Sequence, residues 1–126
     1  MKILLDTHVL LWWLADSPSL SEQARALISA PENAVFVSAV SLWEIWLKQS
    51  LGKLKLPSEF EEKLAAEAFE NLPLTAAHAL QVAFLPWHHR DPFDRMLVAQ
   101  AQVTDLILLT ADDAIPAYGE CVRLVR

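Results

Sequence analysis

Glycine is scarce in this chain of 126 residues, and its only two copies, Gly52 and Gly119, lie far apart. A Walker loop and a GxGxxG turn both need closely spaced glycines, because the backbone must approach a phosphate closely there. The sequence therefore excludes both motifs, and backbone amides are not the means by which this chain would hold a phosphate.

Cysteine and long apolar runs are also lacking. Cys121 is the only cysteine, so no internal disulfide can form and a reducing compartment is expected. The apolar start of the chain is interrupted by Asp6 and His8, and its longest unbroken piece, residues 9–15, is far short of the roughly 18 residues of a membrane span. We therefore expect a cytoplasmic protein that does not cross a membrane.

Positive charge is in the minority, because 10 Lys and Arg face 16 Asp and Glu and give a formal net charge of -6. A protein that coats nucleic acid would be basic, so that class is not expected. An enzyme that acts on nucleic acid through a bound cation remains open. Hydrophobic residues make up 54% of the chain, which argues against disorder and favours a single domain over residues 1–126.

Short apolar segments alternate with amphipathic ones along the chain. Strands are expected at residues 2–5, 35–38, 72–74, 106–109 and 122–125. Helices are expected at residues 9–15, 41–51 and 75–84, and others should begin at Ser19 or Ser21, at Ser58 with a capping box to Glu61, and at Pro92. This alternation predicts an α/β fold, in which a parallel sheet of four to five strands lies between two helical layers.

Residues 89–101 contain the best-defined helix start of the sequence. Asp91 fits the N-cap, and Pro92 fits the first helical position, where its missing N–H costs nothing. Asp94 then falls in the first turn, where its charge faces the positive end of the helix dipole. An ordinary capped helix accounts for all three residues when they are considered alone.

Three further acids occupy similar positions at predicted element ends. Asp6 directly follows the first strand, Glu44 is expected in the first turn of the helix after the second strand, and Asp112 follows the fourth strand. Together with Asp94, they should meet at the carboxyl edge of the sheet, where open α/β folds form their sites. Crowded carboxylates repel, and Mg²⁺, or Mn²⁺ in its place, removes that penalty.

Each acid also has a purely structural explanation. Asp6 fits an N-cap, Glu44 fits a capping box with Ser41, and Asp94 fits the dipole of its own helix. Several nearby residues are weaker candidates for orienting a metal-bound water or for holding a phosphate: Thr7, Ser41, Thr110, Arg90 and Arg95. Five tryptophans are unusually many, and those that reach the surface indicate a protein partner or a dimer interface.

Four blocks of the sequence resemble the PIN-domain family and, within it, the VapC-type toxins of toxin–antitoxin pairs. The blocks follow family order: Asp6-Thr7-His8, residues 37–45, residues 89–101 and residues 108–112. The resemblance implies a Mg²⁺-dependent endoribonuclease, usually dimeric and inhibited by a small antitoxin. The family's four acids fall on Asp6, Glu44, Asp94 and Asp112, although Asp91 and Asp113 lie close enough to replace the last two.

The combined hypothesis is hydrolysis of an RNA phosphodiester by metal-activated water. One alternative is a receiver-like signalling domain, which also gathers acids around Mg²⁺ at strand ends. Such domains pair two early acids and use a lysine after the last strand, whereas this chain has a lone Asp6 and ends in Arg126. A second alternative is a protein-interaction module without catalysis, with the tryptophans as its contact surface.

Overall fold

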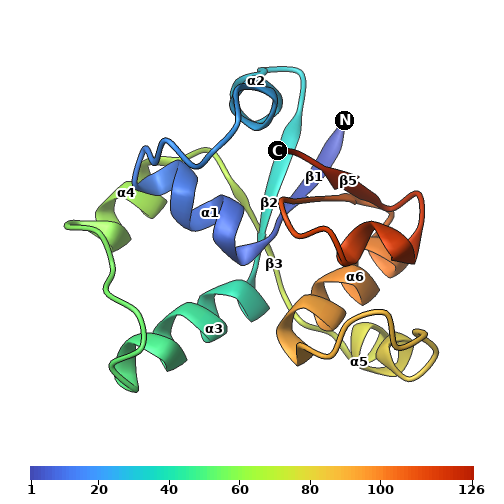
Figure 1. Cartoon of the computed structure of the whole chain (residues 1–126). Coiled ribbons are helices and arrows are strands. Elements are labelled where there is room, and N and C mark those ends of the chain that lie inside the picture. Colours follow the sequence, from blue (N-terminus) through green and yellow to red (C-terminus); the bar gives the residue numbers. More distant parts are fainter.

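The computed structural model describes all of residues 1–126 and contains one parallel sheet between helical layers (Figure 1). The strands are β1 (Lys2–Leu5), β2 (Ala34–Ser38), β3 (Glu70–Leu72), β4 (Ile107–Thr110) and β5 (Val122–Leu124). The helices are α1 (Thr7–Leu14), α2 (Glu22–Ser29), α3 (Ala39–Ser50), α4 (Phe60–Ala66), α5 (Ala76–Val82), α6 (Pro92–Thr104) and the short 3-10 helix η1 (Ile115–Tyr118). The predicted α/β fold with a central parallel sheet is confirmed.

The strand order is β3-β2-β1-β4-β5, and every pairing is parallel. The chain first builds outward on one side of β1 and later crosses to the other side, where β4 pairs with β1 through Leu4 and Leu108. The order therefore reverses between β1 and β4. In open parallel sheets, sites form outside the carboxyl ends of the strands at such a point.

The strand β1 is buried on both faces. Ile3 and Leu5 contribute to one apolar cluster with α1 and α2, whereas Leu4 contributes to a second cluster with α6. Successive strand residues point to opposite faces, so both clusters press on the same strand. Burial of each side chain stabilises the fold by on the order of 1.5–3 kcal/mol. Figure 1 shows α1 and α2 on one side of the sheet and α5 and α6 on the other.

Two predicted helix starts are wrong. Helix α3 begins at Ala39 because the Ser38 hydroxyl, at the end of β2, already accepts the Val40 N–H at 3.0 Å. Glu44 consequently lies in the second turn rather than the first, and no capping box joins it to Ser41. Helix α4 begins at Phe60 after Glu59, whose φ of 60° places the backbone in the left-handed region without any side-chain cap.

The remaining differences are small shifts of element ends. The edge strand β3 ends at Leu72 and does not include Pro73, which has no N–H to donate to a strand ladder. Helix α1 begins at Thr7, since Asp6 serves as its N-cap, and α5 ends at Val82. No helix combines the length and the apolar character that a bilayer crossing requires.

Candidate metal centre

Asp6 joins the end of β1 to the start of α1. Its Oδ1 accepts the Val9 N–H at 2.8 Å, which fixes the carboxylate at the helix N-terminus. The residue is only 4% exposed. Burial raises the pKa of Asp6 above its ordinary value, although hydrogen bonds from Thr110 and from the Val9 N–H partly oppose that shift. The structural role as a cap is therefore real, but it engages only one carboxylate oxygen through the helix backbone.

Only one of the two carboxylate oxygens of Glu44 has a hydrogen-bond partner. Its Oε2 accepts Lys48 Nζ at 2.5 Å, one helical turn further along α3. Its Oε1 is buried and has no hydrogen-bond partner, and it is the only side-chain atom of the chain in that condition. Leaving a charged oxygen buried and unpaired costs free energy, so such an atom points to a missing positive group.

Asp94 lies at the third position of α6, as predicted, with its side chain 20% exposed. Burial, followed by the negative charges of Asp91, Asp6 and Glu44, raises the pKa of Asp94 to about 7. These three acids affect Asp94 because they lie within electrostatic reach of it. The charges of Asp6 and Glu44 thus act on Asp94, although the three acids come from three separate segments of the chain.

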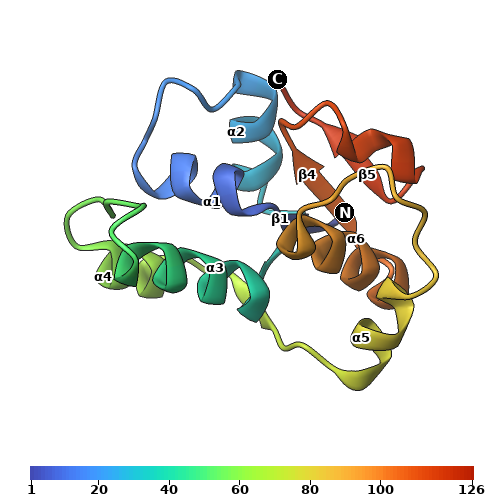
Figure 2. The same ribbon diagram turned by 60° about the horizontal axis from the view of Figure 1, so that its bottom comes forward.

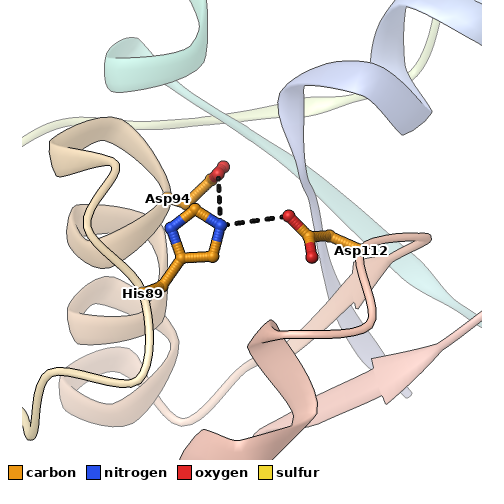
Figure 3. A group of neighbouring side chains, drawn as sticks. All are labelled: His89, Asp94 and Asp112. Carbon is orange, nitrogen blue, oxygen red and sulfur yellow. Dashed lines mark hydrogen bonds and ion pairs between the residues drawn. The ribbon is translucent and has the colours of Figure 1, made fainter.

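His89 bridges two of the acids, as Figure 3 shows. Its Nε2 lies 3.0 Å from Asp112 Oδ2 and 3.6 Å from Asp94 Oδ2. Its Nδ1 accepts the Asp91 N–H at 3.0 Å, which places the ring proton on Nε2, where it can donate to Asp112. One ligand atom from each of His89, Asp94 and Asp112 lies within 4.8 Å of the other two.

The sequence analysis did not single out His89 as a site residue. The available signal was its position two residues before the N-cap of the helix that carries Asp94. Asp112 itself has its pKa lowered by a hydrogen bond from the Ala114 N–H and then by His89. Asp112 is thus held as a carboxylate at the edge of the site, in contrast to the buried Asp6 and Asp94.

Three hydroxyl residues tie the segments of the site together. The buried Thr7 hydroxyl donates to Ser41 Oγ at 3.1 Å and thereby joins the start of α1 to α3. Thr110 Oγ1 accepts the Asp112 N–H at 3.0 Å and shapes the turn after β4. These hydroxyls therefore position the backbone that carries the acids, and none of the three is exposed to solvent.

The suggestion that Arg95 holds a phosphate is wrong. Arg95 is 3% exposed, and its guanidinium donates to the carbonyl oxygens of Pro86, Val82 and Leu85 and to the Tyr118 hydroxyl. All its strong contacts lie inside the protein, because the segment before α6 folds over it. Arg90, by contrast, is exposed and makes no ion pair or hydrogen bond with another side chain.

Asp91 and Asp113, the acids nearest to Asp94 and Asp112 in the sequence, bind groups outside the site. Asp91 Oδ1 accepts the N–H groups of Phe93 and Asp94, at 2.8 and 3.2 Å, and caps α6. Asp113 forms an ion pair with Arg126 at the surface. The geometry therefore favours Asp94 and Asp112, rather than Asp91 and Asp113, as the residues that face the site.

The donor set fits a hard divalent cation such as Mg²⁺ or Mn²⁺. It consists of carboxylate oxygens, one of them buried without a partner, and His89 supports this set as a hydrogen-bond donor to Asp112 rather than as a ligand. An open hollow of about 280 Å³ is lined in part by Asp6, His8 and Asp112 and leaves these two carboxylates accessible from solvent. A cation held here would offset both the burial of the Asp94 charge and the repulsion by neighbouring acids, which together raise the pKa of Asp94.

A model of the PIN domain family matches residues 3–120 of this chain. Ribonuclease VapC22 of Mycobacterium tuberculosis is 34% identical over 120 residues, which cover 92% of this chain and 91% of that protein. The residues matched by the family model contain all four acid-bearing segments, which span residues 6 to 112.

Solved structures with the same fold include toxin–antitoxin complexes. VapBC2 from Rickettsia felis, crystallised with a DNA fragment from its promoter, has a TM-score of 0.76 at 16% identity, with both chains fully covered. FitAcB from Neisseria gonorrhoeae has a TM-score of 0.69 at 24% identity, with 95% of each chain covered. The match to the family model over nearly the whole length shows that this chain belongs to the PIN domain family, in which it is similar to the VapC ribonucleases.

Proposed function

We propose that this protein is a metal-dependent endoribonuclease toxin that hydrolyses RNA phosphodiester bonds. The observation that carries the proposal is the buried, unpartnered Oε1 of Glu44 within a cluster of acids. Family membership and the ribonuclease named as a relative support an RNA substrate. Mg²⁺ is the proposed ion, with Mn²⁺ as a substitute, since all the main ligands are carboxylate oxygens.

Asp6, Glu44 and Asp94 would hold the ion, and Asp112 would orient a water or hold a second ion. A bound divalent cation lowers the pKa of water and offsets the negative charge that develops on the phosphate. The chain's own contribution is rigidity, because the Val9 N–H holds Asp6 and the helix α3 holds Glu44. The Nε2 proton of His89 holds Asp112 in its place at the edge of the hollow.

The proposed regulation is inhibition by a small antitoxin protein. The structural relatives are toxin–antitoxin complexes, and the acidic centre of this chain would attract a basic segment of such a partner. We also propose a homodimer, as the resemblance to VapC-type toxins implies, and a cytoplasmic location, on the basis of the single cysteine.

The experiment is cleavage of RNA by purified, antitoxin-free protein with Mg²⁺ and with excess EDTA. Wild-type protein should cut with Mg²⁺ and not with EDTA, and Asp6→Asn should be inactive. Asp112→Asn should lose activity, whereas its neighbour control Asp113→Asn should keep it, because Asp113 faces Arg126. Undiminished cleavage in EDTA or by Asp6→Asn would overturn the proposal, and a folded protein without cleavage would be the interaction module.

A further inference from the structure

An apolar cavity of about 270 Å³ lies next to the acid centre, between α3, the start of α6 and the segment that precedes α6. Figure 2 shows this segment, which leads from α5, running back alongside α6. The aromatic residues Trp43, Trp87 and Phe93 line the cavity, and so do Arg90 and Arg95. The metal binding and hydrolysis proposed for the acids do not need such a cavity.

The cavity is joined to the acid centre through the chain itself. Trp43 directly precedes Glu44 on α3, and Phe93 directly precedes Asp94 on α6. The rings of Trp43 and Phe93 contact each other edge to face, with centroids 4.9 Å apart. Lys48, which pairs with Glu44, has its Nζ 6.0 Å from the centre of the Phe93 ring. Lys48 therefore links the Glu44 carboxylate to the Phe93 ring.

The ring of Trp87 stacks on Arg95 but remains exposed to solvent. Its ring lies 3.7 Å from the guanidinium carbon of Arg95, a cation that is fixed by hydrogen bonds to three carbonyl oxygens and Tyr118. Despite that stacking, Trp87 remains 74% exposed. Trp43 is also exposed, at 59%. Large aromatic surfaces left open next to a site indicate that a ligand covers them.

The charges near the cavity favour an anionic ligand with aromatic groups. Arg90 lines the cavity, is exposed and has no acidic partner, in a chain whose formal net charge is -6. Aromatic rings beside a free cation are the features by which proteins hold single-stranded nucleic acids, with bases stacked on the rings and phosphates on the cation. An apolar side chain of a protein partner would pack against the rings but would leave Arg90 without a negatively charged partner.

We propose that this cavity binds one unpaired base of the RNA strand, in a nucleotide close to the phosphate that is cut. The base stacks on Trp87 and contacts Trp43 and Phe93, and Arg90 contacts a neighbouring phosphate. Trp87 is thus a specificity-determining residue that does not touch the reacting atoms. This inference rests on the proposed function, since it assigns a substrate subsite to the same centre.

The test measures binding of short single-stranded RNA by fluorescence anisotropy with Ca²⁺ in place of Mg²⁺, while gels verify that the RNA stays intact. Each oligonucleotide of a series lacks the base at one position, and this position differs from one member of the series to the next. Wild-type protein should bind one member of the series at least about fivefold more weakly than intact RNA. Trp87→Ala should bind intact RNA equally weakly and should be insensitive to the same missing base, whereas Trp87→Phe should restore both properties.

Phe84→Ala is the matched control, because Phe84 is an equally exposed aromatic of the same connecting segment but does not line the cavity. It should bind every oligonucleotide like wild type. Arg90→Gln should weaken binding of all members alike and reduce the slope of log affinity against log salt by about one.

The subsite would be overturned if Trp87→Ala bound intact RNA with wild-type affinity. It would also be overturned if removal of the base weakened binding equally in wild type and in Trp87→Ala. A loss of self-association by Trp87→Ala, with RNA binding intact, would assign the rings to a dimer interface instead. If wild type binds with the expected base dependence but cuts no RNA with Mg²⁺, the subsite stands and the proposed hydrolysis fails. If it cuts RNA without base dependence, the hydrolysis stands and the subsite fails.

Discussion

His89 Nε2 lies 3.0 Å from Asp112 Oδ2 and connects the segment before α6 to the turn after β4. Its tautomer is fixed by the Asp91 N–H, which donates to Nδ1. The histidine therefore acts on Asp112 as a hydrogen-bond donor through Nε2. Partners of this kind are worth a factor of about 10–100 in metal affinity or activity where they orient ligands.

Replacement of His89 should therefore lower activity without unfolding the protein. His89→Ala should reduce the rate of RNA cleavage by about 10-fold or more, since Asp112 loses its donor. The measurement is kcat and KM on one RNA, with thermal unfolding as a check of folding. His88→Ala is the control, because His88 packs edge to face on Tyr118 and makes no contact with the acids. Equal effects of the two substitutions would refute a specific role of His89.

Glu44 should dominate the affinity for the ion. Glu44→Gln keeps the shape of the side chain but removes the charge of the unpartnered buried oxygen. Isothermal titration with Mn²⁺ should show binding weakened by about 10-fold or more. Glu62→Gln, on the exposed face of α4, is the control and should titrate like wild type. Wild-type affinity in Glu44→Gln would show that this oxygen is not a ligand.

The stability of the metal-free protein should fall as the pH rises from about 4 to about 7. The folded Asp94 carboxyl has a pKa of about 7, above its ordinary value of 3.8, so in this window the folded state binds more protons than the unfolded state. The free energy of unfolding then decreases with pH, by at most about 1.4 kcal/mol per pH unit for this group. Below pH 3.8, the ordinary pKa, the Asp94 carboxyl is protonated in both the folded and the unfolded state. The contribution of its raised pKa to the free energy of unfolding is then fully present.

Asp94→Asn provides the matched comparison for this pH dependence. Without the charge, the variant should unfold at a higher temperature than wild type at pH 8 in EDTA, and its melting temperature should vary less between pH 4 and 7. The difference should shrink or reverse when Mg²⁺ is added, because the ion stabilises only a folded state that can bind it. Parallel melting curves of wild type and variant across this range would contradict the raised pKa.

Arg95 should matter for stability rather than for contact with RNA. Arg95→Ala removes a buried cation that satisfies three carbonyl oxygens and the Tyr118 hydroxyl. We expect a loss of about 2–4 kcal/mol in the free energy of unfolding, measured with urea. Arg123→Ala, an exposed arginine of β5, should change it by about 0.5 kcal/mol or less. A similar small effect of Arg95→Ala would remove the basis for a rigid Trp87 platform.

The sheet could be predicted from the sequence because its strands are short apolar runs flanked by polar residues. The approximate place of the acids followed from the sheet, since Asp6 directly follows β1, Asp112 closely follows β4, and these two strands pair with each other. The start of α3 could not be predicted, because Ser38 and Ser41 are equally good caps in sequence. Only packing on the sheet selects Ser38 and moves Glu44 into the second turn.

Other features of the site depend on contacts between distant segments. His89 and Asp112 are 23 residues apart, and no periodic pattern links a loop residue to a turn after a strand. The burial of Arg95 was equally hidden, because an arginine in the first turn of a helix is usually solvated. Its partners are carbonyl oxygens of a loop, which carry no side-chain signature in the sequence.

The strand order has a consequence for biosynthesis. The central strand β1 is made first, but its neighbour β4 ends at Thr110, and Asp112 follows only then. A chain still emerging from the ribosome, or one truncated before β4, has one whole side of β1 uncovered and lacks the fourth carboxylate. The acid centre therefore cannot form before the chain has been made past Asp112, so synthesis interrupted earlier releases fragments in which that centre is incomplete.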